Sequence, residues 1–220
     1  SKELGELVNI QHNENIGYYH YAHSYIRGNW KNSNETSPLV LAKSCHDMDI
    51  LLWLTGKHCK YISSFGSLSH MIEENFQDNL LKAYLYAVDS NQTNENLKKA
   101  ITTGPYGKYV YKCDNNVADH MVSILEFENN ITATFNLSDF TNDCSRTTKL
   151  MFTHGEVGGN SLKNVIEVHN FGERNHMIIH PKIVKSGHGG GDFKLMDDFI
   201  KSVNNREAHI KTSAIDSVES

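Results

Sequence analysis

The pattern of hydrophobic and polar positions predicts a long helix over residues 37–56. Hydrophobic side chains recur there at the i, i+4, i+7 and i+11 spacing of one buried helix face. Ser37 is a typical N-cap, Pro38 fits the first helical position, and Gly56 fits a left-handed C-terminal residue. The predicted buried stripe consists of Leu41, Cys45, Met48 and Leu52.

The polar side of this helix carries candidate chemistry. Lys43, His46 and Asp47 are three and four residues apart, so the spacing makes them neighbours on the helix surface. A cation, an imidazole and a carboxylate in one place can hold or move a proton near neutral pH. The same pattern is also typical of an ordinary solvated helix face, so the spacing alone leaves both interpretations open.

Alternating side chains predict strands elsewhere. Residues 118–128 and 130–140 form a hairpin pattern around Glu128–Asn130. In the second strand the alternation places one row toward a core (Ile131, Ala133, Phe135 and Leu137) and the other toward solvent (Thr132, Thr134, Asn136 and Ser138). Further strands are predicted at residues 6–15, 61–69, 146–153, 165–171 and 176–184, with Gly155 and Gly158–Gly159 as turn residues.

Helical patterns also occur outside residues 37–56. Residues 79–85 and 95–101 suggest short helices, and residues 193–203 suggest a last helix with Asp192 as its N-cap. The expected buried stripe of the last helix is Leu195, Met196, Phe199, Ile200 and Val203.

Composition excludes several classes of protein. The chain has 220 residues and a net charge of −5 without any block of Lys or Arg, which argues against a nucleic-acid or anionic-membrane surface. No apolar run approaches the ~20 residues of a membrane span, and Ser1 does not begin a signal peptide. The opening residues do not look like a natural start, so we expect a piece of a longer protein. The cysteines Cys45, Cys59, Cys113 and Cys144 are scattered, which predicts reduced thiols in the cytoplasm and no zinc site.

Residues 17–30 are dense in Tyr, His, Arg and Trp. Aromatic rings with hydrogen-bonding tips suit a sugar-like ligand, whose C–H faces pack on rings while its hydroxyls need donors and acceptors. An aromatic loop packed over a sheet explains the composition equally well. His20 and His23 have metal-ligand spacing but no evident third ligand, so no metal site is predicted.

A glycine-rich run, residues 187–192, precedes the last helix. Glycines before a helix N-terminus can cradle an anion, but this run is neither G-x-G-x-x-G after a strand nor a Walker loop. His188 has small neighbours that leave its ring accessible. The alternative is a flexible turn that leads into a helix.

In this order and spacing the motifs resemble the C-terminal domain of the glucose–fructose oxidoreductase/inositol dehydrogenase/MocA (Gfo/Idh/MocA) family. The resemblance rests on five segments: Gly5–Leu7, Ser24–Trp30, Lys43–Asp49 with Leu52–Gly56, Cys113–His120, and Gly187–Asp192. It implies an α+β fold similar to dihydrodipicolinate reductase, with a large, mostly antiparallel β-sheet and helices on one face. It also implies a homodimer or homotetramer through the other face, although a polar sheet face is also an ordinary monomer surface.

The resemblance further implies an activity. Family members are NAD(P)-dependent oxidoreductases of sugars, inositols and related polyols, and their N-terminal Rossmann domain carries a glycine fingerprint and a Glu-Lys-Pro motif. Neither motif is present here. Residues 1–220 are therefore expected to be a single substrate-binding and oligomerisation domain without its cofactor-binding half. NAD or NADP would bind mainly to that missing half, and the fragment alone is expected to bind no cofactor and to be inactive.

The resemblance also assigns the expected site. His46 matches the family's catalytic histidine, a general acid/base for a substrate hydroxyl. Many members have an aspartate four residues earlier, where this chain has Ala42, so the proton relay is expected to differ. The expected catalytic residues are His46, Lys43 and Asp47, and the expected substrate-binding residues are Tyr19, His20, His23, Arg27, Trp30 and His188.

Two other functions fit the sequence. The first is a non-catalytic carbohydrate-binding or oligomerisation module, which the aromatic and histidine-rich segments support. The second is a glycoside-cleaving relative that uses transient oxidation. The upstream sequence would discriminate the enzyme from the module, because an enzyme requires the glycine fingerprint there.

Overall fold

The structure is a computed structural model that describes residues 3–75, 108–183, 190–205 and 218. The helices predicted at residues 79–85 and 95–101, and the glycine run with His188, lie outside these residues.

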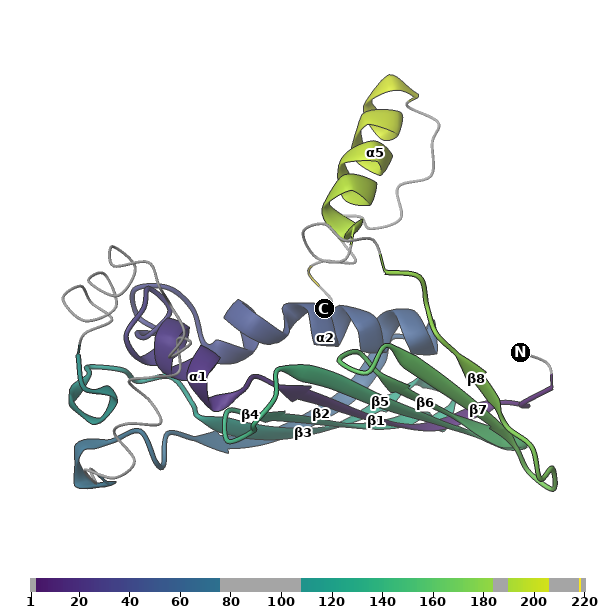
Figure 1. Ribbon diagram of the computed structural model, residues 1–220, viewed down its shortest axis with the longest axis horizontal. Helices are drawn as coiled ribbons and strands as arrows, with labels where there is room; N and C mark the ends of the chain where they lie inside the picture. The colour runs from purple at the N-terminus through teal and green to yellow at the C-terminus, as the bar shows by residue number, and fades with distance from the viewer. Residues whose placement is uncertain (1–2, 76–107, 184–189, 206–217, 219–220) are drawn as a thin grey trace.

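One large β-sheet organises the described chain (Figure 1). Its spatial order is β2-β3-β4-β1-β5-β6-β7-β8, and every neighbouring pair is antiparallel except the parallel pair β1–β4. The mostly antiparallel sheet of the prediction is therefore confirmed. The strands are β1 (Leu7–Asn15), β2 (Cys59–Ser67), β3 (His120–Phe127), β4 (Thr132–Ser138), β5 (Ser145–Phe152), β6 (Gly155–Asn160), β7 (Val165–Asn170) and β8 (Met177–Ile179).

Helices cover one face of this sheet. In Figure 1, α1 (Tyr18–Tyr21) and α2 (Leu39–Thr55) lie over the same face, and a π-helix, η1 (Ala22–Ile26), continues α1. No described element covers the opposite face in this view. The last helix, α5 (Gly191–Asn204), stands away from the sheet. Within the described ranges there are also three short 3-10 turns: η2 (Glu73–Asn75), η4 (Val110–Lys112) and η5 (Glu128–Asn130).

The core lies between the sheet and the covering helices. The β3–β4 hairpin forms as predicted, and β4 buries Ala133, Phe135 and Leu137 while the alternate residues Thr132, Thr134 and Asn136 are exposed. From the helical side, Tyr21 and Leu51 are fully buried in the same cluster. Each such large side chain contributes roughly 1.5–3 kcal/mol by leaving water.

The ends of α2 follow local chemistry. Gly56 ends the helix in the left-handed conformation (φ 59°), and its N–H donates to the Leu52 carbonyl at 2.8 Å. Pro38 is the N-cap, so the prediction of Ser37 as the cap is wrong by one residue. The Pro38 carbonyl accepts hydrogen bonds from the N–H groups of Leu41 and Ala42, which closes the first turn.

The buried face of α2 matches the prediction only in part: Met48 and Leu52 of the predicted stripe are half-buried and pack against the core. The residues turned into the protein are Leu39, Ser44, Asp47 and Leu51, whereas Leu41, at the head of the predicted stripe, is 61% exposed. Asp47 can be buried on this face because the sheet beneath it supplies hydrogen-bonding and charged partners, His12 and Arg146.

The structure also differs from the predictions for the glycines of residues 155–160 and for the aromatic segment 17–30. Residues 155–160 form strand β6 rather than turns. Gly155 is required there, because a Cβ would lie 2.3 Å from the His169 carbonyl oxygen of the neighbouring strand. The aromatic segment 17–30 is largely helical rather than a loop, and it buries Tyr21 and Tyr25 in the core.

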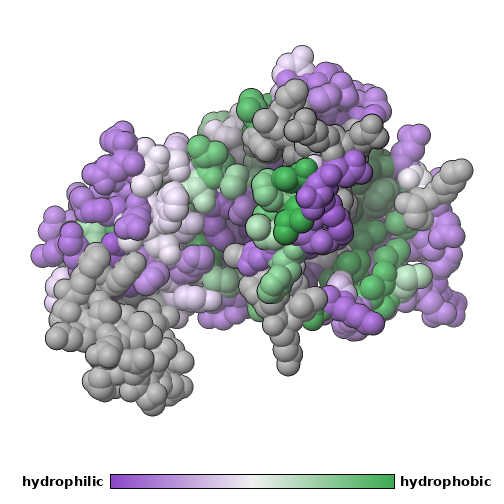
Figure 2. All heavy atoms as spheres, turned by 90° about the horizontal axis from the view of Figure 1, so that it is seen from above, coloured by the Kyte–Doolittle hydropathy of each residue, from purple (hydrophilic) through white to green (hydrophobic). Residues whose placement is uncertain are grey.

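The apolar stripe of α5 is exposed, contrary to the prediction. Phe193, Leu195, Met196, Phe199, Ile200 and Val203 are all 52–72% exposed. Figure 2 looks onto this side of the molecule and shows hydrophobic residues gathered near its centre. The N-cap of α5 is Gly190 (φ 94°) instead of Asp192, which lies in the first turn.

Candidate functional site

The three predicted catalytic residues on helix α2 lie in three different environments. The His46 side chain is exposed on the outer side of the helix. Lys43 lies at the edge of the helix, with its side chain 18% exposed. Asp47 faces the sheet and has no exposed surface. The single polar helix face predicted for these residues is therefore wrong, and only Lys43 borders both the interior and the outer surface.

Asp47 is fixed by residues of β1 and β5. His12 Nε2 donates to Asp47 Oδ1 at 2.9 Å, and Arg146 Nε donates to the same oxygen at 2.7 Å. His12 Nδ1 in turn lies 2.8 Å from the Thr148 hydroxyl. Because these partners belong to two neighbouring strands, Asp47 ties the centre of α2 to the middle of the sheet.

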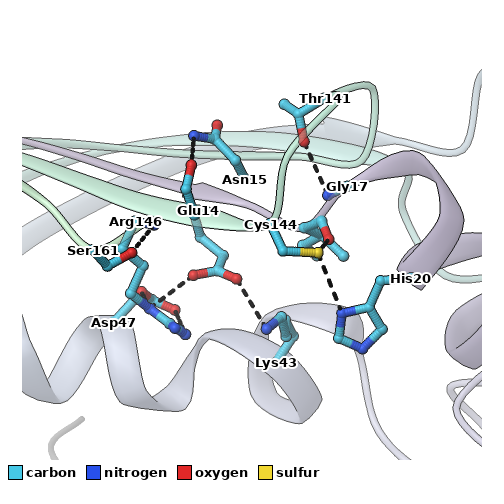
Figure 3. A network of polar contacts seen from close by, with 12 residues as sticks. Glu14, Asn15, Gly17, His20, Lys43, Asp47, Thr141, Cys144, Arg146 and Ser161 are labelled. Carbon is cyan, nitrogen blue, oxygen red and sulfur yellow. Dashed lines mark hydrogen bonds and ion pairs between the residues drawn. The ribbon is translucent and has the colours of Figure 1, made fainter. Parts of the chain in front are cut away.

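A second buried carboxylate completes this group (Figure 3). Glu14 of β1 is 3% exposed; its Oε1 lies 2.9 Å from Lys43 Nζ, and its Oε2 lies 2.8 Å from Arg146 Nε. The group therefore contains two carboxylates, Glu14 and Asp47, and two cations, Lys43 and Arg146. Such pairing is what makes buried charge tolerable in a low-dielectric interior.

The two carboxylates respond differently to burial. Burial alone raises the pKa of Asp47, but hydrogen bonds from His12 and Arg146 outweigh it and hold the pKa below its usual value. For Glu14, burial dominates and raises the pKa, because the hydrogen bond from Lys43 and the charge of Arg146 offset only part of the penalty. Glu14 is thus the carboxylate for which burial outweighs the effect of its charged neighbours.

The predicted substrate-binding residues of α1 and η1 lie partly exposed. Burial lowers the pKa of His20, and the nearby positive charge of Lys43 lowers it further. His20 Nδ1 also lies 3.9 Å from Cys144 Sγ. A hydrogen bond with Cys144, followed by burial, raises the pKa of Tyr19 to about 12. Lys43, His20, Tyr19 and Cys144 therefore form one neighbourhood at the end of α2.

The remaining predicted binding residues differ in how far they are exposed. His23 is partly exposed, and Trp30 is 45% exposed. Arg27 is buried, and its Nε donates to the Ala22 carbonyl at 3.1 Å, which braces the π-helix. π-Helical turns occur frequently at functional sites. His188 lies outside the described residues.

A third buried acid, Asp139, lies just after β4. It has no exposed surface, and neither carboxylate oxygen has a hydrogen-bond partner within the described part of the chain. Burial and the negative charge of Asp119 raise the pKa of Asp139 to about 9, although the charge of Lys43 opposes the rise. Its carboxyl group is therefore neutral at pH 7.

Sequence reasoning missed His12, Glu14, Arg146 and Cys144. A signal was available in β1, where Ile10, His12 and Glu14 alternate and so share the buried face. Nothing local marks Arg146, whose partner Asp47 is 99 residues away in sequence.

Neither a metal site nor a membrane-spanning helix is found among the described residues. No group of three or more His, Cys, Asp or Glu there could hold a metal ion. No helix of the described chain is long and apolar enough to cross a bilayer.

A family model described as "Oxidoreductase family, C-terminal alpha/beta domain" (GFO_IDH_MocA_C) matches residues 1–220. No curated protein matches the chain. Solved structures do match, and the chain spans about half the length of each.

Three of these structures show the range of proteins whose fold is similar to that of this chain. Levoglucosan dehydrogenase in complex with NADH and levoglucosan is 10% identical, with a TM-score of 0.67 over 98% of this chain and 54% of that chain. UDP-N-acetylglucosamine 3-dehydrogenase from Acidithiobacillus ferrooxidans is also 10% identical, with a TM-score of 0.58 over 98% of this chain and 50% of that chain. A super-repressor mutant of Gal80p from Saccharomyces cerevisiae is 13% identical, with a TM-score of 0.61 over 93% of this chain and 47% of that chain. At these identities the likeness concerns the fold.

Proposed function

Because the chain belongs to the Gfo/Idh/MocA oxidoreductase family as its C-terminal α/β domain, we propose that it is the substrate-binding and catalytic half of an NAD(P)-dependent oxidoreductase. The proposed substrate class is a sugar or an inositol-like polyol. The sugar dehydrogenases among the structural neighbours support this class.

The position of His46 carries the proposal. It is an exposed imidazole on α2, one helical turn from the ion-paired Lys43. In the proposed reaction His46 accepts the proton of a substrate hydroxyl as that carbon is oxidised, and it returns a proton in the reverse direction. Lys43 supplies a positive charge that stabilises the developing alkoxide. Asp47, which is fully buried, holds α2 in place instead of touching the substrate.

The proposed substrate wall comes from α1 and η1. The ring of Tyr19 and the imidazoles of His20 and His23 offer apolar faces and polar tips, and Trp30 adds an exposed ring beyond them. Arg27 takes part by bracing η1 through its bond to the Ala22 carbonyl. His188 completes the proposed set.

The cofactor belongs to the rest of the protein in this proposal. Among the described residues, β1 is followed by one glycine, Gly17, and a helix of only four residues, which is not the glycine fingerprint that holds a dinucleotide pyrophosphate. We therefore propose that residues 1–220 are a single domain that is inactive alone. NAD or NADP, which would accept the hydride, binds mainly to an N-terminal Rossmann domain. The exposed apolar stripe of α5 fits a helix that packs against that other half.

We also propose that the uncovered face of the sheet joins copies of the protein into a homodimer or homotetramer. Four exposed apolar side chains lie together on this face of β2 and β3: Tyr61, Phe65, Val122 and Ile124. Beside them runs the polar row Thr132, Thr134 and Asn136. An apolar centre with a polar margin is typical of a subunit interface. The free thiols of all four cysteines favour a cytoplasmic location.

One alternative has a specific observation in its favour. The super-repressor mutant of Gal80p, which is not named as a dehydrogenase, has a fold similar to that of this chain. The departure at Ala42 from the family's usual aspartate is consistent with lost catalysis as well as with altered catalysis. In this alternative the domain is a non-catalytic carbohydrate-binding or oligomerisation module.

The test is a substrate screen with the full-length protein. A panel of sugars and inositols is assayed with NAD and with NADP, and reduced nicotinamide is followed by absorbance. The proposal predicts turnover of at least one substrate that is lost in His46→Ala. Saturable sugar binding without turnover of any panel member would favour the non-catalytic module.

A further inference from the structure

Glu14 is a buried acid that neither the sequence motifs nor the family comparison assigns to a role. It lies on β1, is 3% exposed, and places Oε1 2.9 Å from Lys43 Nζ. Lys43 belongs to α2, so this ion pair joins the helix to the sheet. Of the three predicted catalytic residues, Lys43 is the one that borders both the interior and the surface. Figure 3 shows the Glu14 carboxylate between Lys43 on one side and Arg146 on the other.

The second carboxylate oxygen of Glu14, Oε2, is held by the positive charge of Arg146. Glu14 Oε2 lies 2.8 Å from Arg146 Nε, but that N–H is donated to Asp47 Oδ1, so Oε2 accepts no hydrogen bond within the described chain. The carboxylate therefore has one strong directional partner, Lys43. A buried carboxylate in this state stays ionised only while its cations remain in place.

Other charged or titratable groups face the same place from each neighbouring element. Asp139 follows β4, His20 lies on α1, Arg146 lies on β5, and Asp47 lies on α2 itself. Of these groups, Glu14 is the one whose carboxylate contacts the Lys43 amine directly, at 2.9 Å.

We propose that Glu14 is a positioning residue of the site: it anchors Lys43 to the sheet and holds the Lys43 Nζ atom one helical turn from His46. The inference rests on the proposed function for its catalytic consequence, whereas the anchoring of Lys43 does not. Without the carboxylate, the Lys43 side chain loses its ion-pair partner on the sheet and is free to leave the site.

Chemical labelling of the full-length protein tests the anchoring without any activity assay. Lysines are acetylated with limiting acetic anhydride at pH 7.5, and the modification of each lysine is measured by mass spectrometry. In Glu14→Gln, acetylation of Lys43 is expected to rise at least threefold, while that of Lys149 stays unchanged. The control, Glu156→Gln, removes the surface partner that lies 2.7 Å from Lys149 Nζ and leaves Lys43 labelling unchanged. Unchanged Lys43 labelling in folded Glu14→Gln overturns the inference.

Kinetics of the same variants test the positioning role. Glu14→Gln is expected to lower kcat about tenfold with a smaller effect on KM, and to change the pH dependence of kcat; Glu14→Asp restores part of the loss. Because Glu14 acts through Lys43, the double variant Glu14→Gln/Lys43→Met is expected to match Lys43→Met alone. Additive losses overturn the inference. If Glu14→Gln does not fold, Glu14→Asp gives the same labelling and pH comparison, and wild-type values in both overturn it.

The two proposals fail separately. Normal turnover in His46→Ala contradicts the proposed function but leaves the labelling result intact. Loss of turnover in His46→Ala, together with wild-type labelling and kinetics in Glu14→Gln, overturns only the role of Glu14.

Discussion

His12 and Asp47 form a buried pair that locks α2 onto the sheet. Their Nε2 and Oδ1 atoms are 2.9 Å apart, and the two side chains are 1% and 0% exposed. The pair lies one residue from the exposed His46, so the part of the helix that is held most firmly is the part that presents the proposed acid/base. Rigid support of this kind is what a proton-transfer group requires.

The first prediction concerns this anchor. Asp47→Ala removes one partner of a buried group, leaving His12 Nε2 without its acceptor and Arg146 with only Glu14, so it should reduce the free energy of unfolding by about 3–5 kcal/mol. Asp49→Ala, at an exposed position of the same helix, should change it by less than about 0.5 kcal/mol. Urea unfolding of both variants measures the difference. Equal effects would show that the ion pairs do not anchor α2.

A second prediction follows from Asp139. Its pKa is raised from 3.8 to about 9 by burial and then by the charge of Asp119. A raised folded-state pKa means that the neutral acid stabilises the fold fully below the unfolded pKa, and that this contribution is lost as pH rises toward the folded value. Between about pH 4 and pH 9, the wild-type free energy of unfolding should therefore fall with pH more steeply than that of Asp139→Asn.

The control for this pH dependence is Asp143→Asn, at an exposed position of the following turn. It should keep the wild-type slope. Unfolding curves in urea at several pH values give the comparison. Parallel slopes for wild type and Asp139→Asn would mean that Asp139 does not carry its proton in the folded protein.

A third prediction separates steric from backbone effects at two glycines. Gly17 and Gly56 both have positive φ (82° and 59°), but a Cβ at Gly17 would lie 2.8 Å from Cys144 Sγ, whereas a Cβ at Gly56 meets nothing within 4 Å. Gly56→Ala should cost about 1–2 kcal/mol of backbone strain. Gly17→Ala should cost more, because the clash adds to the strain. Thermal unfolding of the two variants measures the order, and a larger loss at Gly56 would contradict it.

The fourth prediction concerns the uncovered sheet face. A double substitution, Phe65→Glu with Ile124→Glu, places two negative charges in the exposed apolar group of β2 and β3 and should dissociate the proposed oligomer. Phe171→Glu, at an exposed position that follows β7, is the control and should leave the mass unchanged. Light scattering after size exclusion gives the masses. A wild-type protein that is monomeric at high concentration would remove the oligomer proposal.

Some of this fold could be predicted because its signals are local. The β3–β4 hairpin follows from strict alternation around Glu128–Asn130, and the end of α2 follows from a glycine that tolerates positive φ. Strand β6 was missed because its three glycines, Gly155, Gly158 and Gly159, carry no side chains to show a period of two.

The candidate site was harder to predict because its partners come from distant segments. Asp47 looked like a surface residue when only its own helix was considered. Its interior position depends on His12, 35 residues away, and on Arg146, 99 residues away. No helical periodicity contains that information. The exposed position of His46 needed no such partner, and its spacing from Lys43 was visible in the sequence.

Steady-state kinetics of full-length His46→Ala shows whether His46 transfers the substrate proton. In this variant kcat is expected to fall by about 10²-fold or more, KM to change much less, and thermal stability to be retained because the side chain is exposed. His154→Ala, which removes another exposed imidazole in the β5–β6 turn, should keep the wild-type kcat. A folded His46→Ala protein with a kcat close to wild type would show that His46 is not the group that transfers the proton.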